Sequence, residues 1–371
     1  MGVLKVSDEE VIAAIRAAKG IRVDAARKLG INVRSVQSRI DKLIADGIEV
    51  PSSTYDPARS ARMKRGDIVR EPPEKAAQIE FPKLPSGKID VSELIERRKA
   101  AFARKDEAAQ ARKLIPVKVR SSEPIGVTLL GDPHVDDDGT DLGQLERDIR
   151  VIQKTDGLFA ACIGDIQNNW VGRLAKLYGE QETTASQAWQ LVEWFVEELS
   201  GHWLFMVQGN HDHWSGSGDP LRWIQRQAGV SLTGDHTVRV ALRFANGAEV
   251  RVAARHDWPG NSMWNPSHGQ LRAAALTHHD HIIVSGHKHT GGYQMLRIPS
   301  TGMLAHLLQL GSYKIHDAYA DALGLPSRLI APSATAIIDP TASELGQVRI
   351  EHDIEAAADY LTWLRKRRRA A

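Results

Sequence analysis

The sequence has almost no cysteine and no long apolar run, and each shortage excludes a class of protein. Cys162 is the only cysteine among 371 residues, which excludes an internal disulfide and argues against a zinc site built from thiolates. No apolar run approaches the length that spans a membrane, and the first ten residues carry acidic side chains where a secretory signal would be apolar. We therefore expect a protein of the reducing cytoplasm without a membrane segment.

The net charge of +2 hides an uneven distribution along the chain. Residues 1–120 hold 26 lysines and arginines against 17 acidic residues, a balance of +9. Residues 121–350 hold 17 against 25, a balance of −8. This predicts a basic arm that meets polyanions and an acidic body that gathers cations, although solvated surface explains the charges equally well.

Residues 1–50 have the pattern of a small all-α domain. Ser7 and Glu10 have the spacing of a capping box, and helices are expected up to Gly20, over 23–29 and over 33–45. The stretch 22–40 resembles a helix-turn-helix DNA-binding unit, with a tight turn at Gly30. The resemblance places DNA-contacting side chains on its last helix, at Arg34, Ser35, Gln37, Ser38 and Arg39. The alternative is a three-helix unit for protein contact or oligomerisation.

Residues 51–122 are predicted to form a basic, proline-containing linker with one helix over 92–113. The basic cluster between Arg59 and Arg65 is explained equally by a solvated tether or by contact with a nucleic-acid backbone. Residues 353–371 are expected to form a helix with a basic tail at 365–369. A solvated run of charges explains such a tail more often than phosphate binding does.

Residues 123–352 alternate apolar strands with amphipathic helices and then become mostly strands. Strands are expected over 125–130, 158–163, 203–207, 238–244, 250–254, 282–284 and 335–338, and helices over 142–154 and 186–199. This order predicts an α/β domain in which two packed β-sheets form a sandwich with helices outside.

Polar residues recur where those strands end, which is where open α/β folds place their sites. The blocks, in chain order, are Asp132-Pro-His134, Gly164-Asp165, Gly209-Asn210-His211-Asp212, His256, and Gly286-His287-Lys-His289. Carboxylate, imidazole and amide oxygen together suit Mn²⁺, Fe or Zn²⁺ better than Ca²⁺. All five blocks, in this order, resemble the motifs of calcineurin-like metallophosphoesterases over about 160 residues.

The resemblance implies two divalent metal ions, with Mn²⁺ preferred and Fe or Zn²⁺ as alternatives, and a shared hydroxide that attacks phosphorus. Asp165 would bridge both metals; Asp132, His134 and His289 would bind one, and Asn210, His256 and His287 the other. His211 would stabilise the phosphoryl group and protonate the leaving oxygen, and Asp212 would orient His211.

Some assignments near the blocks stay open. His256 is preferred to His268 and His278 because it directly follows an expected strand. Asn168 would support a ligand, touch substrate or cap a turn. Four tryptophans in loops near the blocks would either stack on nucleic-acid bases or pack the loops onto the body: Trp170, Trp214, Trp258 and Trp264.

The metal site specifies phosphoester hydrolysis, and the appended segments must specify the substrate. The helix-turn-helix-like segment, the basic arm and the loop tryptophans favour a DNA-directed phosphodiesterase or nuclease. One alternative is a protein or small-molecule phosphatase targeted by the N-terminal domain. Another is a DNA-binding regulator whose phosphoesterase domain is inactive.

Overall fold

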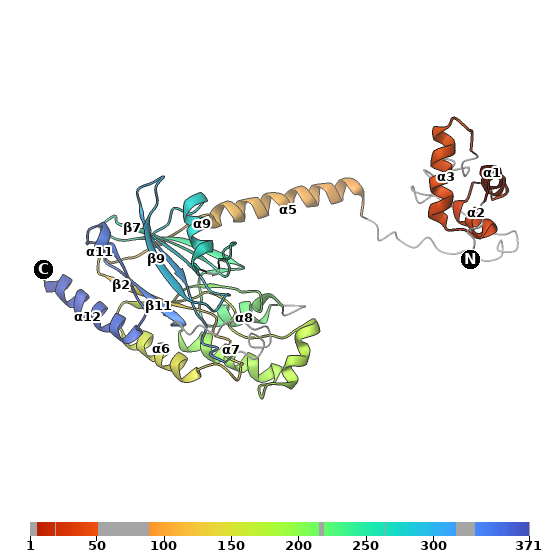
Figure 1. Ribbon diagram of the computed structural model, residues 1–371. Helices are drawn as coiled ribbons and strands as arrows, with labels where there is room; N and C mark the ends of the chain where they lie inside the picture. Colours follow the sequence, from red (N-terminus) through yellow and green to blue (C-terminus); the bar gives the residue numbers. More distant parts are fainter. Residues whose placement is uncertain are drawn as a thin grey trace, which may run out of the picture. The chain divides into compact units, whose positions relative to one another are not determined.

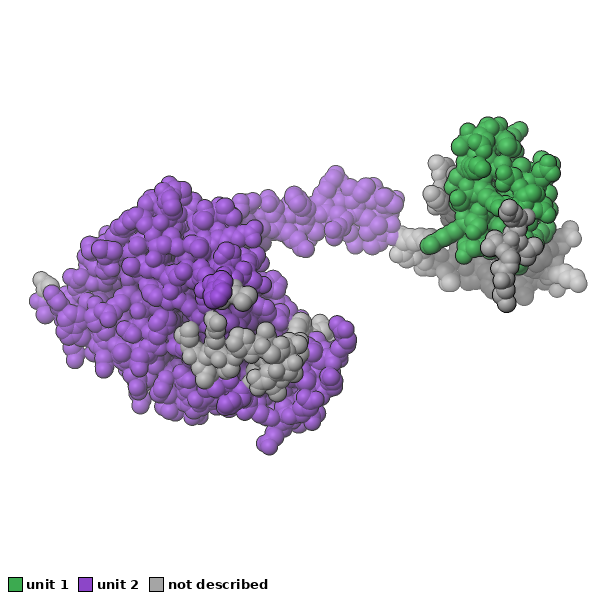
Figure 2. All heavy atoms as spheres, viewed as in Figure 1, with its two compact units in different colours: residues 1–88 green, residues 89–371 purple. Residues whose placement is uncertain are grey.

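The structure is a computed structural model, and it divides into two compact units, residues 1–88 and 89–371 (Figure 2). It describes residues 6–18, 20–50, 89–214, 219–262, 264–316 and 331–370. The basic cluster between Arg59 and Arg65 lies outside these residues. Among the described helices, none combines the length and the apolar character that a bilayer crossing requires.

The first unit is a three-helix domain, which confirms the expected small all-α domain. Its helices are α1 (Asp8–Ala17), α2 (Arg22–Leu29) and α3 (Val33–Ala45). The capping box forms as expected, since Ser7 Oγ accepts the Glu10 N–H while Glu10 accepts the Ser7 N–H. The core is small and lies where the three helices meet; it consists of Val11, Ala14, Ile15, Ala18, Ala25, Ala26, Val36 and Ile40.

A short turn connects α2 to α3. Gly30 ends α2 with a φ of 64°, a conformation that costs glycine little. Asn32 then begins α3, because its side chain accepts the Arg34 N–H at 2.8 Å. Both residues fix the turn that the sequence predicted at this point.

The second unit contains two six-stranded mixed sheets (Figure 1). One has the order β12-β11-β2-β3-β4-β5, in which β2 to β5 are parallel and β11 and β12 antiparallel. Its strands are β2 (Ile125–Leu130), β3 (Leu158–Cys162), β4 (Trp203–Val207), β5 (Thr233–Gly234), β11 (Ser333–Ile338) and β12 (Val348–Glu351).

The other sheet has the order β1-β6-β7-β8-β10-β9. Its strands are β1 (Ile115–Lys118), β6 (Thr237–Arg243), β7 (Glu249–Arg255), β8 (Ile282–Ser285), β9 (Gly292–Arg297) and β10 (Leu304–Gln309). The neighbours β7, β8 and β10 run parallel, so three strand ends point the same way.

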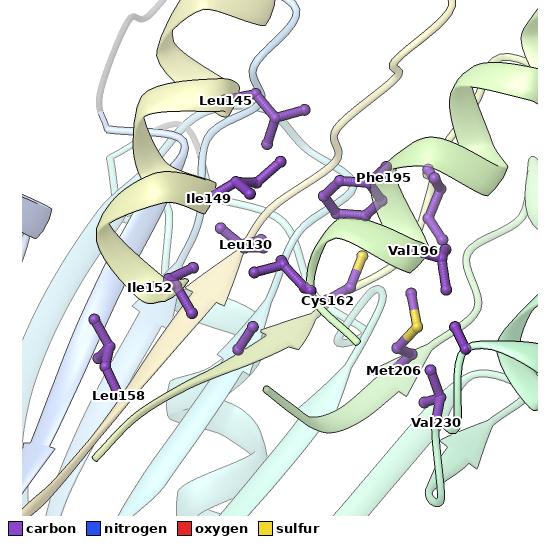
Figure 3. Close-up of a cluster of buried hydrophobic side chains, with 14 of the residues drawn as sticks. Leu130, Leu145, Ile149, Ile152, Leu158, Cys162, Phe195, Val196, Met206 and Val230 are labelled. Carbon is purple, nitrogen blue, oxygen red and sulfur yellow. The ribbon is translucent and has the colours of Figure 1, made fainter. Parts of the chain in front are cut away.

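Three apolar clusters join these elements into four layers. One fills the space between the sheets, with Val127 and Phe205 from one sheet facing Val240 and Val284 from the other. A second lies under the helices that cover the β2 sheet, namely α6 (Leu142–Lys154), α7 (Ala185–Glu198), α8 (Pro220–Gln227) and α12 (Ile354–Ala370) (Figure 3). A third lies between the other sheet and α9 (His268–Leu276). This confirms the sandwich of two sheets flanked by helices.

The ends of the second unit differ from the sequence prediction. The expected helix is present as α5 (Val91–Arg112), but β1 at 115–118 already pairs with β6, so the sheet begins inside the range predicted as linker. The short β1 has two half-buried and two exposed residues, which gives a weak apolar pattern. At the other end, α12 packs its apolar side chains into the core and belongs to this unit.

Candidate metal centre

The expected ligands follow five strands whose carboxyl ends come together. Asp132 and His134 follow β2, Asp165 follows β3, Asn210 follows β4, His256 follows β7, and His287 and His289 follow β8. The strands β2, β3 and β4 are parallel neighbours in one sheet, and β7 and β8 are parallel neighbours in the other. Stacking the sheets therefore places all seven side chains at one edge of the sandwich.

Contacts between the two sheets meet at Asp165. His256 Nε2 lies 3.0 Å from Asp165 Oδ2 and 3.1 Å from Asn210 Oδ1. Ligand atoms of Asp165, His256 and His287 all lie within 4.8 Å of one another. Burial disfavours charge on either partner, but the Asp165–His256 pair raises the pKa of His256 to about 10 and lowers that of Asp165.

A second group of side chains surrounds Asp132. His289 Nε2 lies 3.2 Å from Asp132 Oδ2, and the ring centroid of His289 lies 5.3 Å from that of His134. The ring of His211 meets His134 from another side, at 5.2 Å and nearly perpendicular. Asp132, His134 and His289 thus form a cluster beside the Asp165–His256 pair.

The structure places His256, rather than its rivals, in the centre. His256 Nδ1 lies 2.9 Å from the carbonyl oxygen of Ile163, so this nitrogen carries the proton and donates it. That leaves Nε2, the nitrogen beside Asp165, as the ligand atom. His268 instead begins α9, and the ring of His278 packs against Trp258 at 4.7 Å.

The backbone at the ligands has an uncommon conformation. Six described non-glycine residues have positive φ: Asp132 (32°), His134 (40°), Asp165 (52°), Asn169 (43°), His287 (68°) and His289 (50°). Such conformations cost free energy and collect at functional sites. Five of the six are expected metal ligands, so the fold accepts strain where it aims these side chains.

Two glycines leave room for the carboxylates. A Cβ on Gly209 would collide with Asp165 Oδ1, and a Cβ on Gly286 would collide with Asp132 Oδ1. Each glycine precedes a ligand block in the sequence, so it lets a second strand end approach the carboxylate.

Buried atoms without partners show that the cluster fits cations. Asp132 Oδ1 and both ring nitrogens of His134 have no hydrogen-bond partner within the described residues, although these side chains are 0% and 2% exposed. Burial lowers the pKa of His134, as do His211 and His289, so its ring is neutral. A neutral imidazole and a carboxylate oxygen, both buried and without a hydrogen bond, are suited to bind divalent metal ions.

The side chain of Asp212 binds backbone N–H groups, and its expected role in orienting His211 stays a prediction. Asp212 Oδ2 accepts the backbone N–H groups of Asp165 at 2.9 Å and Gly209 at 2.7 Å, and Oδ1 accepts that of Ile166 at 3.1 Å. The side-chain Nδ1 of His211 instead contacts the carbonyl oxygen of Asn168. Asp212 thus fixes the turns that carry the ligands.

Sequence reasoning missed a lysine at this edge. Lys314 is 8% exposed, its Nζ lies 2.9 Å from Asp137 Oδ2, and it lies 5.5 Å from the ring centroid of Trp170. Asn168 links this group to the centre, since its Nδ2 donates to Asp137 Oδ2 at 2.6 Å. The signal was the polar segment after β10, a strand that was not predicted.

The five residues expected to contact DNA divide into two groups. Arg34, Ser35 and Ser38 are exposed on α3. Gln37 donates to Asp41 Oδ1 at 2.6 Å, and Arg39 contacts the carbonyl oxygen of Val6. These last two side chains make contacts within the first unit.

No protein-family model and no curated protein matches the sequence. Among solved structures, the chain is similar to a Streptococcus pneumoniae protein described as a predicted phosphoesterase, with 13% identity and a TM-score of 0.28 over 62% of this chain and 97% of that one. It is similar to zinc-bound Vps29 from Entamoeba histolytica, with 14% identity and a TM-score of 0.31 over 61% and 97%. It is also similar to the nuclease MPE of Pseudomonas putida, with 13% identity and a TM-score of 0.29 over 60% and 85%.

Proposed function

We propose that the chain is a two-metal phosphoester hydrolase and that DNA is its substrate. The observation that carries the proposal is the convergence of seven ligand-type side chains from two sheets, with the buried Asp165 carboxylate in contact with His256 of the other sheet. Such a set would hold two divalent cations, with Mn²⁺ preferred and Fe or Zn²⁺ as alternatives. Bound there, the cations would polarise phosphoryl oxygens and make water a better nucleophile.

The assignment of ligands follows the contacts. Asp165 lies in the group with His256 and His287, and its backbone carbonyl accepts the N–H of His134 at 3.1 Å, so we assign it as the residue that would bridge the cations. Asp132, His134 and His289 would hold one cation, and Asn210, His256 and His287 the other.

His211 is the residue that would move a proton. Its Nδ1 contacts the Asn168 carbonyl, and its Nε2 lies 3.9 Å from Asp165 Oδ2, so that nitrogen faces the centre. In hydrolysis, water oxygen bonds to phosphorus as the ester P–O bond breaks, and His211 would give a proton to the departing oxygen.

The DNA part of the proposal is supported by the first unit. Its short turn between α2 and α3 and the exposed Arg34, Ser35 and Ser38 on α3 have the chemistry of a groove-contacting helix. A polyanion would be drawn by the positive balance of residues 1–120, whereas residues 121–350 are acidic.

The test is Mn²⁺-dependent cleavage of end-labelled single-stranded and double-stranded DNA, with His211→Ala as the control. Cleavage that is lost in the variant supports a nuclease with its chemistry at this site. If wild type cleaves neither single-stranded nor double-stranded DNA but hydrolyses a phosphomonoester, the DNA assignment is wrong and a phosphatase is supported. If wild type hydrolyses neither DNA nor the phosphomonoester, the proposed phosphoesterase activity is wrong.

A further inference from the structure

The loop between β7 and α9 starts with His256 and presents a tryptophan to solvent. Trp264 in this loop is 90% exposed, the highest value among the large apolar side chains of the described residues. Trp170 and Trp258, which sequence grouped with it, are only 8% and 5% exposed. The structure therefore separates packing tryptophans from one that is available to a ligand.

The loop is held in place on both sides of Trp264. Ser262 Oγ accepts the backbone N–H groups of Trp264 at 3.3 Å and Asn265 at 3.2 Å. Pro266 packs closely against Gly292, since a Cβ atom added to Gly292 would lie 2.9 Å from the Cβ of Pro266. These contacts hold the backbone that carries the indole.

Lys288 ties the loop to the metal centre. Its Nζ donates to the carbonyl oxygen of Gly260 at 2.7 Å and lies 3.3 Å from Asp257 Oδ1. Lys288 stands between the two expected ligands His287 and His289. The position of the loop is thus set by the same turn that presents those ligands.

A hollow lies between the loop and that turn. It measures about 390 Å³ and is lined by Gly260, Asn261, Ser262, Pro266, Lys288 and Thr290. Most of its lining surface is apolar, and Asn261, Ser262 and Thr290 add amide and hydroxyl groups that suit sugar and phosphate oxygens. Its volume is at the lower end of ligand pockets, which suits one nucleotide better than a duplex.

We infer that Trp264 stacks on an unpaired base of the strand whose scissile phosphate lies at the metal centre. An exposed indole has a large apolar face that gains free energy when a flat ring covers it. Aromatic platforms beside a phosphate-binding site accept any base, because every base has a π-face. The inference rests on the proposed function and deepens it: the substrate is single-stranded or unpaired at this position.

Two labelled oligonucleotides test the inference: a thymidine strand, and the same strand with abasic residues around the cleaved linkage. Wild type is expected to cleave the thymidine strand with a kcat/KM roughly 5- to 150-fold higher, the range that stacking energies give. Trp264→Ala should remove this preference and leave the abasic strand cleaved at the wild-type rate, whereas Trp264→Phe should keep most of it. Trp363→Ala, at a half-exposed tryptophan on α12, is the matched control and should behave as wild type.

The other outcomes distinguish a failure of the stacking inference from a failure of the proposed nuclease activity. If Trp264→Ala slows both strands equally, or wild type shows no preference, the stacking inference is wrong and the proposed nuclease stands. If wild type cleaves neither strand, the proposed nuclease is wrong, and fluorescence anisotropy with both strands then tests stacking. If wild type and Trp264→Ala bind the thymidine strand with equal affinity, the stacking inference is wrong.

Discussion

At the scale of single residues, Asp165 and His211 have different roles and should be separable. Asp165→Asn removes the charge between the two ligand groups, so both turnover and bound metal should fall. His211→Ala removes a proton donor that is not a ligand, so kcat should fall by about 100- to 10,000-fold while metal stays bound. Metal content by mass spectrometry, measured beside turnover, distinguishes the two. Equal metal loss in both variants would show that His211 is a ligand.

Tyr313 shows how a buried hydroxyl can contribute to stability. Its side chain is fully buried, and its hydroxyl donates to Asp148 Oδ2 at 2.7 Å, where Ser333 also donates at 3.0 Å. Tyr313→Phe removes one donor from a buried carboxylate and should lower the free energy of unfolding by about 1.5–3 kcal/mol.

Urea unfolding of the full chain measures the effect of Tyr313→Phe, and Tyr360→Phe is the control because Tyr360 is partly exposed on α12. A loss of the same size in both variants would show that the bond to Asp148 contributes nothing.

The sequence named the ligand types but not how they are held. Strand ends predicted Asp132 and Asp165, because polar residues directly follow apolar runs there. The bonds of Asp212 to backbone N–H groups were not predictable, since they depend on three turns meeting in space. Lys314 was missed because β10, the strand that precedes it, was not predicted.

At the scale of elements, α12 shows a basic tail used inside the fold. Arg365 is 8% exposed; its guanidinium donates to the Pro124 carbonyl at 2.6 Å and lies 2.6 Å from Glu123 Oε2 and 3.0 Å from Asp156 Oδ2. Arg368 pairs with Asp339 at 2.6 Å. Arg365 is therefore buried rather than solvated, whereas Arg368 is paired but exposed.

Arg365→Ala should detach the end of α12 and lower the free energy of unfolding of the second unit by about 2 kcal/mol. The value is below that of a fully buried pair because Asp156 is 73% exposed. Arg367→Ala, at an exposed arginine over Trp363, should change stability by less than about 0.5 kcal/mol. Thermal unfolding of both variants checks this, and equal melting temperatures would contradict the anchoring role.

Elements with clear apolar runs were predicted, and those without were not. Both β2 and β3 consist almost wholly of buried apolar residues and stood out. In β10, the buried polar residues His306 and Gln309 interrupt the apolar pattern. In β9, half-buried and exposed positions alternate but Tyr293 and Met295 are among the exposed ones, which reverses the usual pattern.

At the scale of the whole molecule, the two units have separate cores and separate charge. The three helices bury their own apolar cluster, and the sandwich buries three others. Residues 1–88 hold 17 lysines and arginines against 12 acidic residues, which leaves residues 89–371 with more acidic than basic side chains. Binding of DNA and hydrolysis should thus be separable by cutting the chain between the units.

A chain of residues 89–371 should hydrolyse bis(p-nitrophenyl) phosphate within about twofold of the full chain, because all seven expected ligands lie in this unit. Its affinity for duplex DNA should fall, and the dependence of that affinity on salt should become less steep, because fewer phosphates are neutralised.

Arg34→Glu in the full chain is the matched single change, since Arg34 is exposed on α3. It should weaken duplex binding at low salt and leave hydrolysis of the small diester unchanged. Unaltered DNA affinity in both proteins would assign the three-helix unit to protein contact instead, the alternative that its sequence left open.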